Sequence, residues 1–285
     1  MHHERYILTL SCVDTRGIVA AVTTFLTKQC GFIIESGQFG DESTGHFFMR
    51  VEFSLQGGAP SATLLRAYFS EQVATPFDMH WDIHSKNTKA RVLVLVSKHG
   101  HCLHDVLYRT STGQLPIEIP VIVSNHPDMA SIAEWHKVPY HHFAAEENKP
   151  QQEAKIISLV EQLKIDVVVL ARYMQILSPE LSEKLAGRAI NIHHSFLPSF
   201  KGARPYAQAY ERGVKLIGAT AHYVTDDLDE GPIIEQEVAR VDHTHTPEDL
   251  AAIGRDIECQ VLARALKFHI ERRVILNGKK TVVFR

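Results

Sequence analysis

The spacing of hydrophobic and polar positions changes near residue 90 and divides the chain into two parts. The first part has short runs in which apolar and polar residues alternate, as in strands, and longer runs with helical spacing. Strands are predicted at 6–12, 32–40, 46–54 and 77–84, and helices at 19–29 and 61–73. The βαββαβ order predicts an open antiparallel, ferredoxin-like sheet with helices on one face.

Beyond a polar linker at 84–89, the pattern is that of an α/β domain. Residues 90–97 and 166–170 are unbroken apolar runs, typical of strands buried on both faces of a parallel sheet. Further strands are predicted at 119–124, 218–224 and 233–241, helices at 102–109, 129–136, 153–163, 179–185 and 246–272, and a closing hairpin around Asn277-Gly278. This alternation predicts a doubly wound α/β domain with its site at the carboxyl ends of strands. The sequence therefore predicts two domains, 1–85 and 90–285.

Two stretches place polar side chains where predicted strands end. Asn191 and His193 alternate directly after an apolar run, so both side chains leave the same face. The stretch 218–232 is strand-like at first, then becomes acidic around Asp229 and stops at Gly231-Pro232. An amide, an imidazole and a carboxylate can polarise a carbonyl, move protons and orient a reactant. The pattern favours acyl-type chemistry.

The same stretches carry a family resemblance. Residues 191–198 read Asn-Ile-His-x-Ser-x-Leu-Pro, and residues 222–233 read His-x-Val-x-x-x-Leu-Asp-x-Gly-Pro-Ile. Together these motifs resemble the formyltetrahydrofolate-dependent formyltransferase family. The resemblance implies that Asn191, His193 and Asp229 are the catalytic trio.

A third segment, 171–178, resembles the part of this family that wraps the pterin ring of the folate. The substrate-binding residues expected on this resemblance are Met174, Gln175, Ile176, Leu177, His194, His222 and Asp226. A helix core would also explain Met174 and Leu177, and Gln175 stands where many members carry Arg. His194 and His222 either line the site or support His193, and support is the favoured interpretation. Asp226 and Asp227 are read as solvated loop acids whose backbone contacts the folate.

The loop at 97–103 bears on the acceptor of the formyl group. In relatives that act on glycinamide ribonucleotide, a glycine-rich loop here holds the acceptor's phosphate with bare backbone amides. In this chain Lys98, His99, His101 and Cys102 leave one glycine, so backbone approach to a phosphate is obstructed. An enzyme that holds the formyl donor without that phosphate pocket would deliver the formyl group to water.

Together with a match at 202–206, these features resemble the formyltetrahydrofolate deformylase family over the whole chain. The resemblance implies hydrolysis of 10-formyltetrahydrofolate to formate and tetrahydrofolate. Asn191 and His193 would stabilise the oxyanion, and Asp229 would position and deprotonate water. It implies no metal and no cofactor besides the folate itself.

The N-terminal part resembles an ACT domain, a small ligand-binding regulatory module. The match is the first strand followed by Asp14-x-Arg16-Gly17-Ile18-Val19, together with the element order. It implies an amino-acid effector at Asp14, Gly17 and Ile18, and a homo-oligomer. A local explanation stays open, in which Gly17 permits a tight turn and Asp14 caps the helix.

Composition limits the possible partners, the location and the metal content of the protein. The 285 residues carry a net charge of −3 without a basic stripe, which disfavours a nucleic-acid partner. No apolar run is long enough for a membrane span, and the four cysteines are scattered without a Cys-x-x-Cys pair, which predicts reduced thiols and a cytoplasmic protein. The 18 histidines include no His-Glu-x-x-His pattern, so no dedicated metal site is expected.

Two alternatives to the hydrolase remain. The first is a formyltransferase to a small amine acceptor, against which the 97–103 loop argues when the acceptor bears a phosphate. The second is a non-catalytic folate or amino-acid sensor, which would not need Asn191, His193 and Asp229 together.

Overall fold

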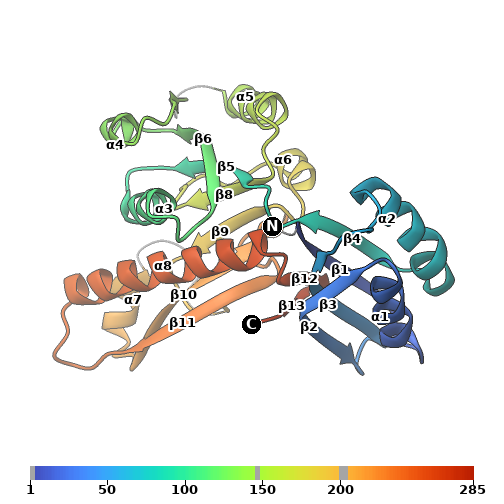
Figure 1. Cartoon of the computed structure of the whole chain (residues 1–285). Coiled ribbons are helices and arrows are strands. Elements are labelled where there is room, and N and C mark those ends of the chain that lie inside the picture. The colour runs from blue at the N-terminus through green and yellow to red at the C-terminus, as the bar shows by residue number, and fades with distance from the viewer. Residues whose placement is uncertain (1–3, 145–147, 199–204) are drawn as a thin grey trace. The chain divides into compact units, whose positions relative to one another are not determined.

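The computed structural model describes residues 4–144, 148–198 and 205–285. The chain divides into two compact units. Figure 1 shows the helices and strands of both. The first consists of Met1–Thr88 with Phe268–Asn277 and Val282–Arg285, and the second of Lys89–Lys267 with Gly278–Thr281. The C-terminal segments thus belong to the same compact unit as the N-terminal residues.

The first unit has the element order expected from its hydrophobic pattern. Its strands are β1 (Arg5–Val13), β2 (Gly31–Asp41), β3 (His46–Leu55) and β4 (His80–Ser85), and its helices are α1 (Ile18–Lys28) and α2 (Ala62–Phe69). The strands form an antiparallel sheet in the order β2-β3-β1-β4, so the predicted ferredoxin-like architecture is confirmed. Helix α2 begins with the Ser61 side chain accepting a hydrogen bond from Leu64.

The second predicted helix ends earlier than its apolar spacing indicates. Helix α2 stops at Phe69, and the chain continues as a π-helical turn, Ser70–Ala74, and a 3₁₀ turn, Thr75–Phe77. Pro76 has no backbone N–H to continue the helix, and Asp78 adopts a left-handed conformation with φ of 49°. The last strand therefore begins at His80 instead of residue 77.

The C-terminal segments are tied to the edge strand β2 by polar contacts. Arg273 Nη1 donates to Glu35 Oε1 at 2.9 Å, and Asn277 Nδ2 donates to Asp41 Oδ2 at 2.7 Å. The buried Arg50 of β3 donates from Nε to the carbonyl of Glu271 at 3.2 Å. These contacts join residues far apart in the sequence, so no local sequence pattern predicts them.

The second unit contains the doubly wound sheet. Its strands are β5 (Ala90–Val96), β6 (Ile117–Ser124), β7 (Tyr140–His142), β8 (Val167–Ala171), β9 (Ala189–His193), β10 (Leu216–Tyr223) and β11 (Ile233–Arg240). The order is β11-β10-β9-β8-β5-β6-β7. Strands β7, β6, β5, β8 and β9 are parallel neighbours, and β10 and β11 extend the sheet with antiparallel pairing.

Helices connect these strands as the alternation predicts. They are α3 (His101–Ser111), α4 (Ala130–Trp135), α5 (Lys149–Gln162), α6 (Pro179–Lys184), α7 (Pro205–Glu211) and α8 (Pro247–Ile270), and the hairpin β12 (Val274–Asn277) and β13 (Lys280–Val283) follows. Strand β7 and helix α7 were not predicted, because the short Tyr-His-His strand lacks an apolar run and α7 has only two turns. None of the described helices has both the length and the apolar character of a membrane span.

Helix α8 starts where the sequence predicts. Thr246 Oγ1 accepts a hydrogen bond from the Asp249 backbone N–H, and the Asp249 carboxylate accepts one from the Thr246 backbone N–H, which makes a reciprocal cap. Pro247 occupies the first turn, where its missing N–H costs nothing. The cap fixes the start of a 24-residue helix whose buried Glu258 reaches the site described below.

Acid should destabilise the first unit through His269. Burial, together with the nearby Arg272 charge, lowers the pKa of this imidazole to about 3. Below about pH 6.5 the unfolded chain binds a proton that the folded chain does not, so the free energy of unfolding should fall by up to about 1.4 kcal/mol per pH unit. Urea denaturation at about pH 7.5 and about pH 5.5 should show a smaller loss for His269→Gln than for wild type or for the exposed control His80→Gln. Equal losses in all three would contradict this assignment.

Candidate active site

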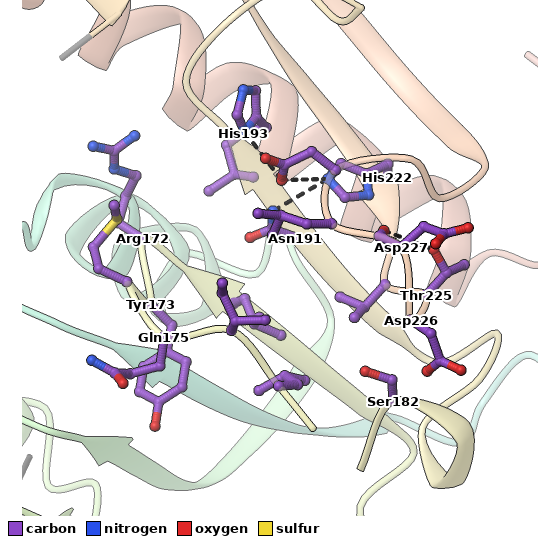
Figure 2. A pocket seen from close by; sticks show the side chains of 18 of the residues that line it. Arg172, Tyr173, Gln175, Ser182, Asn191, His193, His222, Thr225, Asp226 and Asp227 are labelled. Carbon is purple, nitrogen blue, oxygen red and sulfur yellow. Dashed lines mark hydrogen bonds and ion pairs between the residues drawn. The ribbon is translucent and has the colours of Figure 1, made fainter. Parts of the chain in front are cut away.

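One cavity of about 220 Å³ in the second unit gathers every catalytic and substrate-binding residue expected from the sequence (Figure 2). Those residues are Met174, Gln175, Ile176, Leu177, Asn191, His193, His194, His222, Asp226 and Asp229. Strand β9 contributes Asn191 and His193, whose alternate positions bring both to the cavity. The loop after β10 contributes Asp226 and Asp229.

Asp229 lies against two histidines. Its Oδ1 is 3.2 Å from His193 Nδ1 and 3.7 Å from His222 Nε2. Burial by itself would raise the pKa of Asp229, but the contacts with His193 and then His222 outweigh it and hold this pKa well below its ordinary value. Asp229 is therefore a carboxylate at neutral pH.

The hydrogen bonds of His222 orient Asn191. His222 Nδ1 is 2.8 Å from the carbonyl of Tyr223, which only accepts, so this nitrogen donates. In the neutral ring Nε2 then accepts, and Asn191 Nδ2 donates to it at 3.2 Å. Asn191 and His222 are also paired across β9 and β10. One N–H of the Asn191 amide is thereby used, and the other is left for a ligand.

His194 is held neutral beside the trio. Its ring centroid is 5.1 Å from that of His193 and 6.4 Å from that of Tyr206. Burial, reinforced by the Arg172 charge, lowers the pKa of His194 to about 3. His194 thus adds a neutral imidazole to the cavity wall.

The segment after β8, residues 172–178, is held in place by Ser97, which follows β5, and by Glu153 of α5. The Met174 backbone N–H donates to Ser97 Oγ at 3.0 Å, and Ser97 Oγ donates to Asn125 Oδ1 at 2.6 Å. Downstream, the Ser178 backbone N–H donates to Glu153 Oε1 at 2.8 Å. The segment keeps an irregular backbone along the cavity, with polar backbone groups available to a heterocycle.

The same segment gives the cavity an apolar rim. Met174 and Ile176 are 53% and 59% exposed, and Leu228 from the opposite loop is 56% exposed. The helix-core explanation is wrong for Met174, because the segment is not helical and this side chain is exposed; Leu177 is instead buried in the core cluster of the sheet. Exposed apolar side chains around a polar centre suit a flat ring with one reactive polar group.

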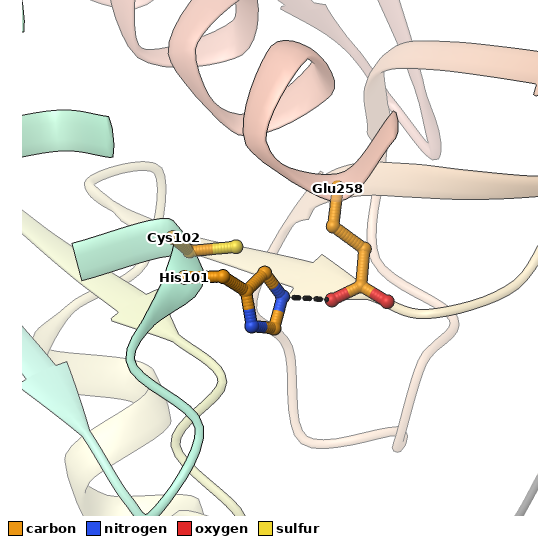
Figure 3. A group of neighbouring side chains, drawn as sticks. All are labelled: His101, Cys102 and Glu258. Atoms are coloured by element: carbon orange, nitrogen blue, oxygen red, sulfur yellow. Dashed lines mark hydrogen bonds and ion pairs between the residues drawn. The ribbon is translucent and has the colours of Figure 1, made fainter. Parts of the chain in front are cut away.

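A second group of polar side chains meets at the start of α3. His101 Nε2 is 2.7 Å from Glu258 Oε2 (Figure 3). Tyr206 donates its hydroxyl to Glu258 Oε1 at 2.6 Å. Arg172 Nε lies 3.5 Å from Glu258 Oε2. Burial raises the pKa of Glu258, but the hydrogen bond from His101 and the Arg172 charge outweigh it and lower that pKa overall. Glu258 is a buried carboxylate with three partners.

The chemistry of this group suits a hydrogen-bond network better than a cation site. His101, Cys102 and Glu258 offer ligand atoms within 4.8 Å of one another. However, the hydrogen bond with Cys259 and burial raise the pKa of the Cys102 thiol well above its usual range, and the Arg172 cation already neutralises Glu258. A metal would have to displace a proton and compete with a guanidinium.

A family model described as formyl transferase matches residues 90–266. A relative named formyltetrahydrofolate deformylase, from Corynebacterium sp. (strain P-1), is 51% identical over 99% of this chain and 98% of its own length. The chain belongs to the formyltetrahydrofolate deformylase family.

Solved structures agree with this family membership. A formyltetrahydrofolate deformylase from Burkholderia mallei superposes with a TM-score of 0.94 at 52% identity, covering 99% of this chain and all of that one. A glycinamide ribonucleotide transformylase from Symbiobacterium toebii has a TM-score of 0.67 at 28% identity and covers 72% of this chain and 98% of that one. The predicted fold, an ACT-like unit with a formyltransferase-like α/β domain, is confirmed.

Sequence reasoning missed three residues that build the site. Ser97 anchors the 172–178 segment, Glu258 reaches the site from α8, and Arg172 lines the cavity. Only Arg172 had a local signal, since it lies in the segment that resembles the pterin-binding part of the family. The residues of the 202–206 match that precede Pro205 lie outside the described residues.

The residues expected to hold an effector lie at the start of α1. Gly17 precedes the helix with φ of 97°, a conformation that favours glycine, and Ile18 is buried in the core of the first unit. The alternative in which Asp14 caps the helix is wrong, because the N-cap is Gly17 without a side-chain hydrogen bond. Asp14 instead donates its backbone N–H to the carbonyl of Gly45 at 2.8 Å. Effector binding at these residues stays a prediction.

Gly231 should be essential for the geometry of the Asp229 loop. A Cβ here would lie 1.7 Å from the backbone oxygen of Tyr223 and 3.2 Å from His222 Nδ1. Gly231→Ala must therefore move the backbone beside Asp229, and we expect about 1–3 kcal/mol lower stability and a loss of formate release of about 10-fold or more. Thermal unfolding and initial rates would measure both effects. Gly57→Ala, which has open space around its Cβ, is the matched control, and wild-type activity in Gly231→Ala would contradict the role of the loop.

Proposed function

We propose that the chain hydrolyses 10-formyltetrahydrofolate to formate and tetrahydrofolate. The observation that carries this proposal is the meeting of Asn191, His193 and Asp229 in one cavity with an apolar rim, in a chain whose relatives are named formyltetrahydrofolate deformylase. The rim would take the pterin ring, and the polar trio would act on the formyl group.

The oxyanion is stabilised by Asn191 and His193. The unused N–H of the Asn191 amide donates to the formyl oxygen. The Asp229 carboxylate only accepts, so His193 Nδ1 carries a proton, and Nε2 donates when the ring is an imidazolium. Both donors then strengthen their hydrogen bonds as charge develops on the formyl oxygen.

Asp229 positions the attacking water. Its contacts with His193 and His222 both involve Oδ1, so Oδ2 is left to accept a hydrogen bond from water. Because the pKa of Asp229 is low, the proton moves to it only as bonding to the formyl carbon makes the water acidic. The proton then passes to N10 as the carbon–nitrogen bond breaks, which gives formate and tetrahydrofolate.

Formate release without an amine acceptor tests this proposal. The purified full-length protein is incubated with 10-formyltetrahydrofolate, and formate and tetrahydrofolate are quantified. Equal amounts of both products support the hydrolase. Turnover that begins only when an amine is added would support a transferase, and folate binding without turnover in either condition would support a sensor.

The remaining features of the proposal concern partners and location. We propose that the folate acts as substrate, with an amino-acid effector at the ACT-like unit and a homo-oligomeric assembly by analogy with ACT units. The free cysteines Cys12, Cys30, Cys102 and Cys259 support a reducing, cytoplasmic compartment.

A further inference from the structure

The cavity contains buried nitrogen atoms without hydrogen-bond partners. Among the described residues, four buried side-chain atoms lack such a partner: Arg172 Nε, Arg172 Nη1, His193 Nε2 and Arg264 Nε. The first three belong to residues that line the active-site cavity. The side chains of Arg172 and His193 are 10% and 5% exposed, so water satisfies these groups poorly. Unpaired nitrogens gathered in one cavity, two of them on a guanidinium that can only donate, indicate a ligand that accepts hydrogen bonds.

The guanidinium of Arg172 is held in place by the charge of Glu258, but its Nε and Nη1 atoms make no hydrogen bond there. The 3.5 Å approach of Arg172 Nε to Glu258 Oε2 is an ion pair without hydrogen-bond geometry. Glu258 is itself fixed by His101 and Tyr206. The network therefore sets the position of a cation whose N–H groups remain available.

The backbone of Arg172 gives a second, independent indication. Its φ is 63°, in the left-handed region that an L-residue with a long side chain rarely adopts. Glycine would occupy this position without strain. Strain at a residue whose side chain lines an active site indicates a function for that side chain.

We propose that Arg172 and His193 Nε2 form a subsite for formate, the carboxylate product of hydrolysis. This inference rests on the proposed function and specifies where its anionic product is held. One oxygen of formate comes from the formyl group and lies at Asn191 and His193 Nε2. The other comes from water and is held by the Arg172 guanidinium, whose planar donors match a carboxylate.

Charge explains why this subsite would serve hydrolysis. The formyl amide of the substrate is neutral, whereas the tetrahedral intermediate and formate are negative, so Arg172 interacts more strongly as the reaction proceeds. His194 is neutral and adds no competing cation. In Figure 2 the side chains of Arg172 and His193 extend to the same end of the pocket, away from Ser182 and Asp226. An amide-forming transfer would release no carboxylate at this place.

Equilibrium binding of formate tests the subsite without relying on turnover. Sodium formate is titrated calorimetrically into the full-length protein saturated with tetrahydrofolate, with sodium chloride as the reference anion. Arg172→Gln should weaken formate binding about 10- to 100-fold, because a charge-assisted pair is lost. Arg172→Lys should recover part of the affinity, since it keeps the charge and loses the planar fork. The matched control is Arg264→Gln, which removes an arginine with the same kind of unpartnered Nε outside the cavity and should bind formate as wild type does.

If Arg172 only supported the fold, its variants would change stability and not formate affinity. Arg172→Gly relieves the backbone strain but also removes the cation beside the buried Glu258, so circular dichroism is used to confirm that the variant is folded. Folded Arg172→Gly should lose formate binding. Unchanged formate affinity in folded Arg172→Gln or Arg172→Gly, or no formate binding by wild type, would overturn the proposal. If wild type binds formate through Arg172 and does not hydrolyse the folate, the subsite stands and the proposed function fails. If the protein hydrolyses the folate but its formate affinity does not depend on Arg172, the proposed function stands and the subsite fails.

Discussion

Asp229→Asn should lower the rate of formate release by about 10²- to 10⁴-fold, the usual contribution of an acid–base group. The amide keeps the shape of the side chain, but it cannot take a proton from water. It also removes the charge that lies beside His193 and His222. Initial rates with saturating 10-formyltetrahydrofolate measure the loss. The substrate KM should change little, since the apolar rim is untouched.

Two further measurements make the Asp229 result specific. Asp256→Asn, an exposed acid on α8, is the control for the chemical change and should retain wild-type rates. Because the pKa of Asp229 is lower in the folded state, its stabilising effect is present above the pKa of the unfolded chain, about 4, and is lost as pH falls through the folded value. The stability difference between wild type and Asp229→Asn should therefore shrink in acid. Full hydrolysis by the Asn variant would refute the catalytic assignment.

Asn191→Ala should reduce kcat by about 10²- to 10³-fold, the typical cost of removing one oxyanion donor. The Asn191 amide is held by His222 Nε2 at 3.2 Å, so its second N–H is preorganised toward the cavity. Alanine removes the donor and leaves the β9 backbone pairing in place. Rates at saturating substrate would separate this loss from weaker substrate binding.

The arrangement around Asn191 offers its own controls. Asn87→Ala changes an exposed amide of the first unit and should leave the rate unchanged. His222→Gln should lower kcat less than Asn191→Ala, because glutamine can still accept a hydrogen bond from Asn191. A loss in Asn191→Ala that appears only in KM would show that Asn191 binds the substrate and does not stabilise the oxyanion.

Local patterns were sufficient wherever the cause of structure is local. Alternation places Asn191 and His193 on one face of β9, and the Thr246 and Asp249 pair starts α8, because both features arise from residues a few positions apart. The βαββαβ order of the first unit follows from the same periodicities. The family resemblance then gave ten of the residues that line the cavity, since its motifs fall on those strand ends.

Tertiary structure alone decided how distant parts meet. Hydrophobic spacing does not reveal that β10 pairs antiparallel with both β9 and β11, since strand direction depends on the connections and neighbours. It likewise could not show that Glu258 of α8 holds Arg172, or that His222 orients Asn191. These contacts join residues far apart in the chain, and their energy depends on burial and on geometry that exist only after folding. The sequence by itself determined the elements and the reactive side chains, and the folded structure determined which of those side chains face one another.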